Sequence, residues 1–265
     1  MKSHGTAAPS DTSVARAASL WLAVAAAIAC FASGPAAGRL RAAEPVGAIA
    51  VPAAAPAPSQ WDRWEKNIKA IEDRERESPP PAGCVLFLGS SNIRMWYSLA
   101  QDFPDHDVVN RGFGGCQMAD IDHFAERLIG ESRPAVIVVS AGANDIHAGR
   151  TPEQVRDAFA AFVATARAIR PEARIIYLGI AATTARIKER PEQRRAFELI
   201  QEFVSGEKNI EVIDLENVYC NPDGTIDPEC LRADKLHPSP KGNARRAAII
   251  RPRLGPAVRS SSAPR

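Results

Sequence analysis

Five short apolar runs constrain the fold of this chain more than any other feature. The runs span residues 84–89, 107–110, 135–140, 174–180 and 210–214. Runs of this length are typical of strands that are buried on both faces of a sheet. Between and around them lie helical patterns at residues 61–77, 117–130, 151–169, 190–205 and 239–251. Alternation of this kind predicts an α/β fold: a parallel sheet of about five strands in a three-layer α/β/α domain.

The composition is that of an ordinary globular protein, with 45% hydrophobic and 24% charged residues. The formal net charge of +2 is too small to indicate a nucleic-acid surface. The sequence contains neither a C-x-x-C pair nor an H-E-x-x-H motif, so we predict no metal and no cofactor.

The chain divides into four parts. We expect residues 61–254 to form one globular domain and residues 255–265 to form a loose tail. Residues 1–43 contain a short apolar run followed by small residues, which is typical of a signal peptide rather than of a stable membrane span. Residues 44–60 are rich in Ala and Pro and read as an extended linker. We therefore expect an exported protein, periplasmic or secreted, with the exact cleavage site left open.

The cysteines bear on the same question of compartment. Cys30 closes the apolar run, where a bacterial lipoprotein signal also places its cysteine, so lipidation is a second option. In an exported protein Cys220 and Cys230 are candidates for a disulfide, because they bracket one short loop. The alternative is that the thiols of the domain stay reduced.

Polar turns follow three of the predicted strands, and a fourth precedes the last helix. They are Gly89–Asn92, Asn110–Gly115, Gly142–Asp145 and Asp234–His237. Ligands of open parallel sheets bind beyond the carboxyl ends of the strands. These turns are therefore expected to meet at one edge and to form the site.

Together, the turns supply what acyl transfer requires. A serine hydroxyl needs a base within hydrogen-bond reach, and a histidine suits neutral pH. We predict a serine of the first turn, Ser90 or Ser91, as the nucleophile, His237 as the base and Asp234 as the carboxylate that orients it. The oxyanion needs donors, for which we predict the side-chain amide of Asn144 and a backbone N–H at Gly115.

The four turns, in this order, resemble the motifs of the SGNH/GDSL hydrolases. The segments that carry the resemblance are Phe87–Arg94 (FLGSSNIR), Gly112–Gly115 (GFGG), Gly142–Asp145 (GAND) and Asp234–His237 (DKLH). The resemblance covers nearly the whole predicted domain and implies a flavodoxin-like fold and a serine esterase or acylhydrolase. It also implies that Ser91 is the nucleophile, with His237 as its base and Asp234 as the partner of the histidine. The oxyanion hole is then formed by the backbone N–H of Ser91 with Gly115 and Asn144, while Asp145 has a structural role.

The sequence departs from the family pattern at one position, because Ser90 stands where the family has Asp. The change leaves open whether Ser90 or Ser91 faces the cleft. The oxyanion donor is open in the same way between Gly114 and Gly115. The substrate class is a small-molecule, lipid or carbohydrate ester, with acetyl and longer acyl groups both allowed, and the oligomeric state is not indicated.

Two other readings compete with the esterase. A non-catalytic glycan- or surface-binding module could keep the same fold and the same residues. A nucleotide-binding protein of similar fold would need a phosphate-binding loop such as G-x-x-x-x-G-K-[ST], which this sequence lacks. A basic cluster remains outside these assignments and is most simply a solvated face: Arg186, Lys188, Arg190, Arg194 and Arg195.

Overall fold

The computed structural model describes residues 59–130 and 132–256. The predicted signal segment 1–43 with Cys30, nearly all of the linker 44–60 and most of the tail 255–265 lie outside the described residues. The described residues belong to one compact unit.

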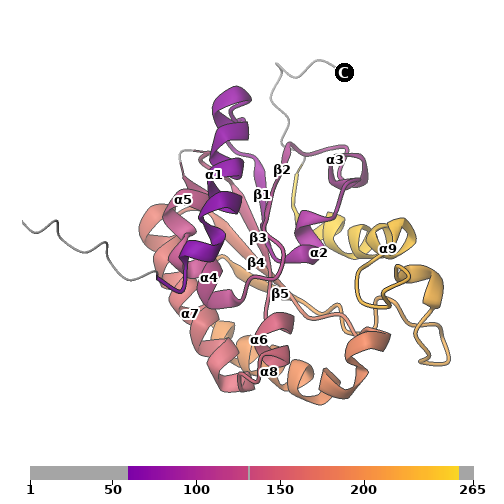
Figure 1. The fold of residues 1–265 in the computed structure, drawn as a ribbon. Coiled ribbons are helices and arrows are strands. Elements are labelled where there is room, and N and C mark those ends of the chain that lie inside the picture. Colours follow the sequence, from indigo (N-terminus) through magenta and orange to yellow (C-terminus); the bar gives the residue numbers. More distant parts are fainter. Residues whose placement is uncertain (1–58, 131, 257–265) are drawn as a thin grey trace, which may run out of the picture. The chain divides into compact units, whose positions relative to one another are not determined.

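A five-stranded parallel sheet forms the centre of this unit (Figure 1). Its strands are β1 (Val85–Gly89), β2 (Val108–Gly112), β3 (Val136–Ser140), β4 (Arg174–Leu178) and β5 (Ile210–Ile213). Their order across the sheet is β2-β1-β3-β4-β5, and all neighbouring pairs are parallel. This is the order of flavodoxin-like folds, in which the connections reverse direction between β1 and β3. The prediction of a parallel α/β/α domain is confirmed.

Helices cover both faces of the sheet. The α-helices are α1 (Asp62–Glu77), α2 (Ser91–Arg94), α3 (Leu99–Asp102), α4 (Met118–His123), α5 (Ala125–Ile129), α6 (Ala143–His147), α7 (Pro152–Ile169), α8 (Arg190–Val204) and α9 (Pro240–Ile250). Short 3₁₀ segments add η1 (Thr184–Glu189), η2 (Pro228–Cys230) and η3 (Arg251–Arg253).

Alternate strand residues point into two separate cores. Leu86 and Leu88 of β1 lie in a core shared with α1, α4, α5, α7 and α8, whereas Val85 and Phe87 lie in a core shared with α2, α3 and α9. Figure 1 shows these two groups of helices on opposite sides of the sheet. Apolar side chains on both faces explain why each strand reads as a continuous apolar run.

One predicted helix, at residues 117–130, is broken in two. Phe124 separates α4 from α5 with dihedral angles of φ −96° and ψ 11°, outside the helical range. Its buried ring packs edge-on against Phe113, with ring centroids 6.3 Å apart. The break between α4 and α5 therefore coincides with the packing of Phe124 in the core. The helical pattern of the sequence does not show this break.

Candidate active site

Ser91 lies at the turn where β1 meets α2. Gly89 ends the strand so close to β3 that a Cβ there would lie 2.4 Å from the carbonyl oxygen of Ser140. Only glycine allows this approach, and the chain then turns directly into α2, which begins at Ser91. Ser91 is thereby placed at the carboxyl end of a central strand.

Ser91, His237 and Asp234 form a continuous hydrogen-bonded relay. His237 Nε2 lies 2.9 Å from Ser91 Oγ, and His237 Nδ1 lies 2.7 Å from Asp234 Oδ2. Ser90 instead is buried, with 6% of its surface exposed. The structure therefore pairs Ser91, and not its neighbour, with the histidine.

Asp234 is held ionised by the loop that it shares with His237. Partial desolvation acts to raise its pKa, but hydrogen bonds from the backbone N–H and imidazole of His237, and from the backbone N–H of Leu236, outweigh it and lower the pKa of Asp234 to about 2. Asp234 Oδ1 accepts from both backbone N–H groups at 2.9 Å. One carboxylate thus shapes the loop with one oxygen and orients the imidazole with the other.

An arginine connects this loop to the serine turn. Arg232 Nε donates to the carbonyl oxygen of Pro238 at 3.0 Å, and its NH2 donates to the carbonyl oxygen of Met95 at 3.3 Å. The backbone N–H of Arg232 also donates to the carbonyl oxygen of His237 at 2.8 Å. Arg232 therefore spans the gap between two segments that lie far apart in the sequence.

The predicted oxyanion donors come from two other strand ends. Asn144 lies in α6, directly after β3, and its Nδ2 donates to the carbonyl oxygen of Cys116 at 3.0 Å. Gly115 is exposed in the loop between β2 and α4 and has φ +90°, a conformation that favours glycine. A Cβ on Gly114 would lie 2.7 Å from Arg94 Nε. The backbone path of this loop therefore favours glycine at both positions.

Asp145, beside Asn144, faces the interior. It is 3% exposed and accepts the backbone N–H of Met118 at 3.0 Å. Burial raises the pKa of Asp145 to about 6, against the effect of the Met118 hydrogen bond. This carboxylate joins α6 to the start of α4, which matches the structural role that the resemblance implies.

A shallow depression lies beside Ser91. Its lining includes Asn92, Asn144, Ala181, Thr183, Arg186 and Leu236. Thr183 and Arg186 belong to the connection after β4, and neither residue is among the site residues predicted from the sequence. The available signal was a polar segment that follows a strand of the sheet, the same signal that located the other turns.

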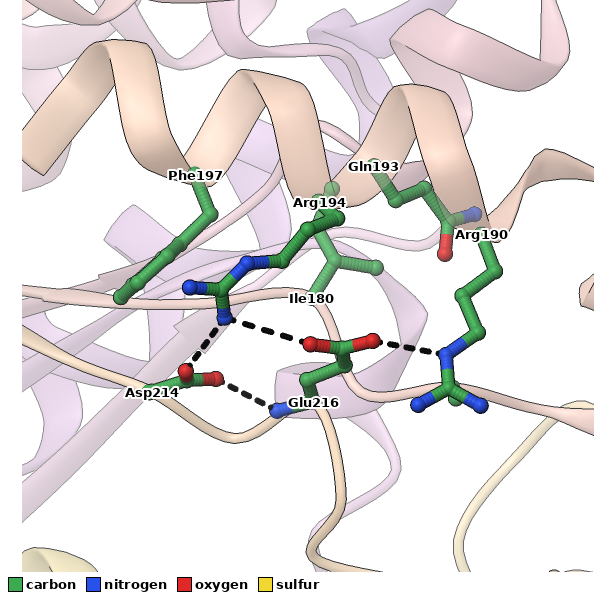
Figure 2. A pocket seen from close by; sticks show the side chains of 8 residues that line it. Ile180, Arg190, Gln193, Arg194, Phe197, Asp214 and Glu216 are labelled. Carbon is green, nitrogen blue, oxygen red and sulfur yellow. Dashed lines mark hydrogen bonds and ion pairs between the residues drawn. The ribbon is translucent and has the colours of Figure 1, made fainter.

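The basic cluster is only in part a solvated face, because Lys188 and Arg195 are exposed whereas Arg186 is largely buried. Figure 2 shows Arg194 between Asp214 and Glu216, with Arg190 on the other side of Glu216. Arg195 pairs with Glu198 and Glu202 on its own helix. Arg186 points inward and is bound to Asn144. The expectation of a solvated face is therefore wrong for Arg186, because the fold brings Asn144 within its reach.

Neither the cysteines nor any group of possible metal ligands forms a second functional site in the part of the chain that the structure describes. Cys84, Cys116, Cys220 and Cys230 are all free thiols, so the structure does not form the candidate disulfide between Cys220 and Cys230. Within residues 59–130 and 132–256 no cluster of side chains is suited to hold a metal ion. No helix in that part of the chain is long and apolar enough to cross a bilayer.

The fold and the relay are consistent with an ester hydrolase, and comparison with known proteins agrees. Residues 82–245 match the GDSL-like lipase/acylhydrolase family, and the chain belongs to this family. It is an enzyme that hydrolyses ester bonds.

Sequence relatives include the alpha1 subunit of platelet-activating factor acetylhydrolase IB. The bovine protein is 28% identical over 204 residues, which cover 72% of this chain and 84% of that protein. The human protein is 27% identical over the same lengths.

Solved structures with the same fold include three bacterial proteins. A putative platelet activating factor from Streptococcus pneumonia has a TM-score of 0.65 at 19% identity and covers 72% of this chain and 92% of that one. A putative acylhydrolase from Bacteroides fragilis has a TM-score of 0.61 at 18% identity and covers 75% and 98%. An acetyl xylan esterase from Geobacillus stearothermophilus has a TM-score of 0.55 at 16% identity and covers 68% and 99%.

Proposed function

We propose that the protein removes short acyl groups, acetyl foremost, from an alcohol through a covalent acyl-Ser91 intermediate. The observation that carries this proposal is the relay from Asp234 through His237 to Ser91, with distances of 2.7 and 2.9 Å. This is the arrangement of nucleophile, base and orienting carboxylate that acyl transfer uses.

In the first half-reaction, Ser91 Oγ attacks the ester carbonyl carbon while its proton passes to His237 Nε2. The carbonyl oxygen becomes an oxyanion, which the N–H groups of Ser91, Gly115 and Asn144 stabilise. The bond to the alcohol oxygen then breaks, and His237 returns the proton to the departing alcohol. Asp234, ionised throughout, stabilises the imidazolium between these two transfers.

In the second half-reaction, water takes the place of the alcohol. His237 accepts a proton from this water, which attacks the acyl carbon of acyl-Ser91. Collapse of the second oxyanion breaks the bond to Ser91 Oγ, and His237 reprotonates the serine. The products are the free alcohol and a carboxylic acid.

The preference for a short acyl group rests on two supports. The depression beside Ser91 has a volume of about 20 Å³. That is room for little more than one water molecule, so a long acyl chain would not fit inside it. A sequence relative is named as an acetylhydrolase, and a structural relative as an acetyl xylan esterase. Both a lipid and a carbohydrate are candidates for the alcohol part of the ester.

Hydrolysis of p-nitrophenyl acetate, butyrate and octanoate by the full chain tests the proposal, together with labelling by a fluorophosphonate probe. We expect acetate to react best, and Ser91→Ala to lose both activity and label, with a fall in kcat of roughly 10⁴-fold or more. Ser90→Ala is the matched control and should keep both. A folded wild type that neither hydrolyses these esters nor takes the label would favour the non-catalytic binding module.

Export is proposed separately, from residues 1–43 alone. A signal peptide predicts that the mature protein, recovered from the periplasm or the medium, begins after residue 34 or 43, which N-terminal sequencing measures. A lipid on Cys30 would instead place it in the membrane fraction.

A further inference from the structure

Arg186 contacts the side chain of Asn144 and not the solvent. Its guanidinium NH1 and NH2 both donate to Asn144 Oδ1 at 3.1 Å, and NH1 also donates to the carbonyl oxygen of Ala143 at 2.9 Å. The Arg186 side chain is 12% exposed. Its donors are therefore largely committed to α6.

These contacts fix which end of the Asn144 amide faces Arg186 and which faces Cys116. A guanidinium can only donate hydrogen bonds, so the atom that faces Arg186 has to be the oxygen of the amide. On the other side, the carbonyl oxygen of Cys116 can only accept, so the atom that faces it has to be the nitrogen. A flipped amide would oppose donor to donor and acceptor to acceptor.

The same contacts leave one N–H of Asn144 for the reaction. Nδ2 carries two N–H groups, and Cys116 takes one of them. The positive charge at Oδ1 draws electron density from the amide and strengthens the remaining N–H as a donor. Arg186 thus acts on the group that the proposed reaction needs, without a place of its own at the oxyanion.

The segment that carries Arg186 is anchored at several points. Ala185 N–H donates to the carbonyl oxygen of Lys235 at 3.0 Å, within the loop of Asp234 and His237. Ala182 N–H donates to the carbonyl oxygen of Glu216 at 3.0 Å, and Arg190 Nε binds the Glu216 carboxylate at 2.7 Å (Figure 2). The connection between β4 and α8 is therefore held against both the triad loop and the end of β5.

We propose that Arg186 is a positioning residue: it locks the amide of Asn144 in the orientation that donates to the oxyanion. The inference rests on the proposed function, because it assigns Arg186 a role in the oxyanion hole of that reaction. An alternative role is direct binding of an anionic part of the substrate through the two N–H groups, on Nε and NH2, that Asn144 and Ala143 do not occupy. That role would show as a rise in KM when Arg186 is replaced, whereas a positioning role lowers kcat.

A double-mutant cycle on p-nitrophenyl acetate tests the inference with the full chain. We expect Arg186→Met to lower kcat by roughly 10- to 100-fold with KM changed less than about threefold, below the ~10²–10³ of losing an oxyanion donor outright. Arg186→Lys keeps a charged donor without the planar fork and should recover part of the loss. In an Asn144→Ala background, Arg186→Met should change kcat less than about threefold, because the group it positions is gone.

Arg195→Met is the matched control, since Arg195 pairs only with Glu198 and Glu202 along its own helix among the described contacts. It should leave kcat unchanged, and melting curves should show each variant folded. If Arg186→Met has wild-type kcat, or if its effect multiplies with that of Asn144→Ala, the inference is wrong. A wild type inactive on the ester would overturn the proposed function, and the inference with it, whereas an active wild type indifferent to Arg186 overturns the inference alone.

Discussion

The site has a triad half, formed by Ser91, Asp234 and His237, and an oxyanion half, formed by Gly115 and Asn144. Each half is bound by one arginine, but the two arginines contact different kinds of groups. Arg232, in the triad half, donates only to backbone carbonyl groups and joins the His237 loop to the turn of Ser91. Arg186, in the oxyanion half, donates to the side chain of Asn144 itself. Arg232 therefore supports a loop, a role that any well-anchored hydrogen-bond donor can fill. Arg186 instead orients the amide of Asn144, a role that depends on the chemical identity of the donor.

The halves also differ in how they are assembled. Asp234 and His237 lie three residues apart, and Asp234 Oδ1 accepts two backbone N–H groups within the same loop. Gly115, Asn144 and Arg186 come from three separate connections of the sheet. The triad loop is thus partly set by local hydrogen bonds, whereas the oxyanion half exists only once β2, β3 and β4 are in register.

The largest expected effect is in the triad half. Asp234→Asn should lower kcat by roughly 10³–10⁴-fold, because an amide favours the wrong histidine tautomer and no longer stabilises the imidazolium. Since the pKa of Asp234 is about 2, the wild-type pH–rate profile from pH 4 to 9 should contain no titration of this group. Steady-state kinetics measure both, and activity within tenfold of wild type would exclude Asp234 as the partner of His237.

A smaller effect is expected in the oxyanion half. Asn144→Ala should lower kcat by roughly 10²–10³-fold with little change in KM, because the donor acts mainly on the developing charge. Asn221→Ala, in an exposed loop, is the control. A loss of less than about fivefold would mean that Asn144 does not donate to the oxyanion and would leave this half to the backbone.

A stability measurement then probes the scaffold of the oxyanion half. The pKa of Asp145 is raised by burial from 3.8 to about 6, so the folded protein holds a proton that the unfolded chain releases between these values. The free energy of unfolding contributed by Asp145 therefore falls as pH rises from about 4 to 6, by at most roughly 3 kcal/mol, and is constant above that.

Asp145→Asn removes this titration while keeping an acceptor for the Met118 N–H. Urea unfolding of both proteins from pH 4 to 7.5 should show the variant gaining stability relative to wild type up to about pH 6. A difference that is constant across this range would contradict the assignment.

The smallest expected effect is that of the arginine in the triad half. Arg232→Met should lower kcat about tenfold and the free energy of unfolding by about 1–2 kcal/mol, through the loss of charge-assisted hydrogen bonds to carbonyl groups. Because Arg232 does not touch Asn144, its effect should multiply with that of Asn144→Ala. If instead Arg232→Met has no effect in the Asn144→Ala background, both arginines act through one network and the comparison between the halves fails.

The sequence by itself determined the strands and the fold class, and it predicted the candidate site residues with the choice between Ser90 and Ser91 left open. Apolar runs buried on both faces reveal strands without any long-range information, and their alternation with helices leaves few topologies. The carboxyl ends of parallel strands meet at one edge, so the sequence predicts that the turns with Ser91, Gly115 and Asn144 form one site. Asp234 and His237 lie close enough in sequence for one loop to supply both.

Only the tertiary structure decided which serine faces His237, where the helix at residues 117–130 breaks, and what Arg186 does. The direction of the Ser90 and Ser91 side chains depends on how β1 turns against Ser140 of β3. A short helix such as α2 or α6 has too few residues to show a period. Arg186 reads in sequence as one of several exposed arginines, because its partner lies 42 residues away and reaches it only when the sheet is complete.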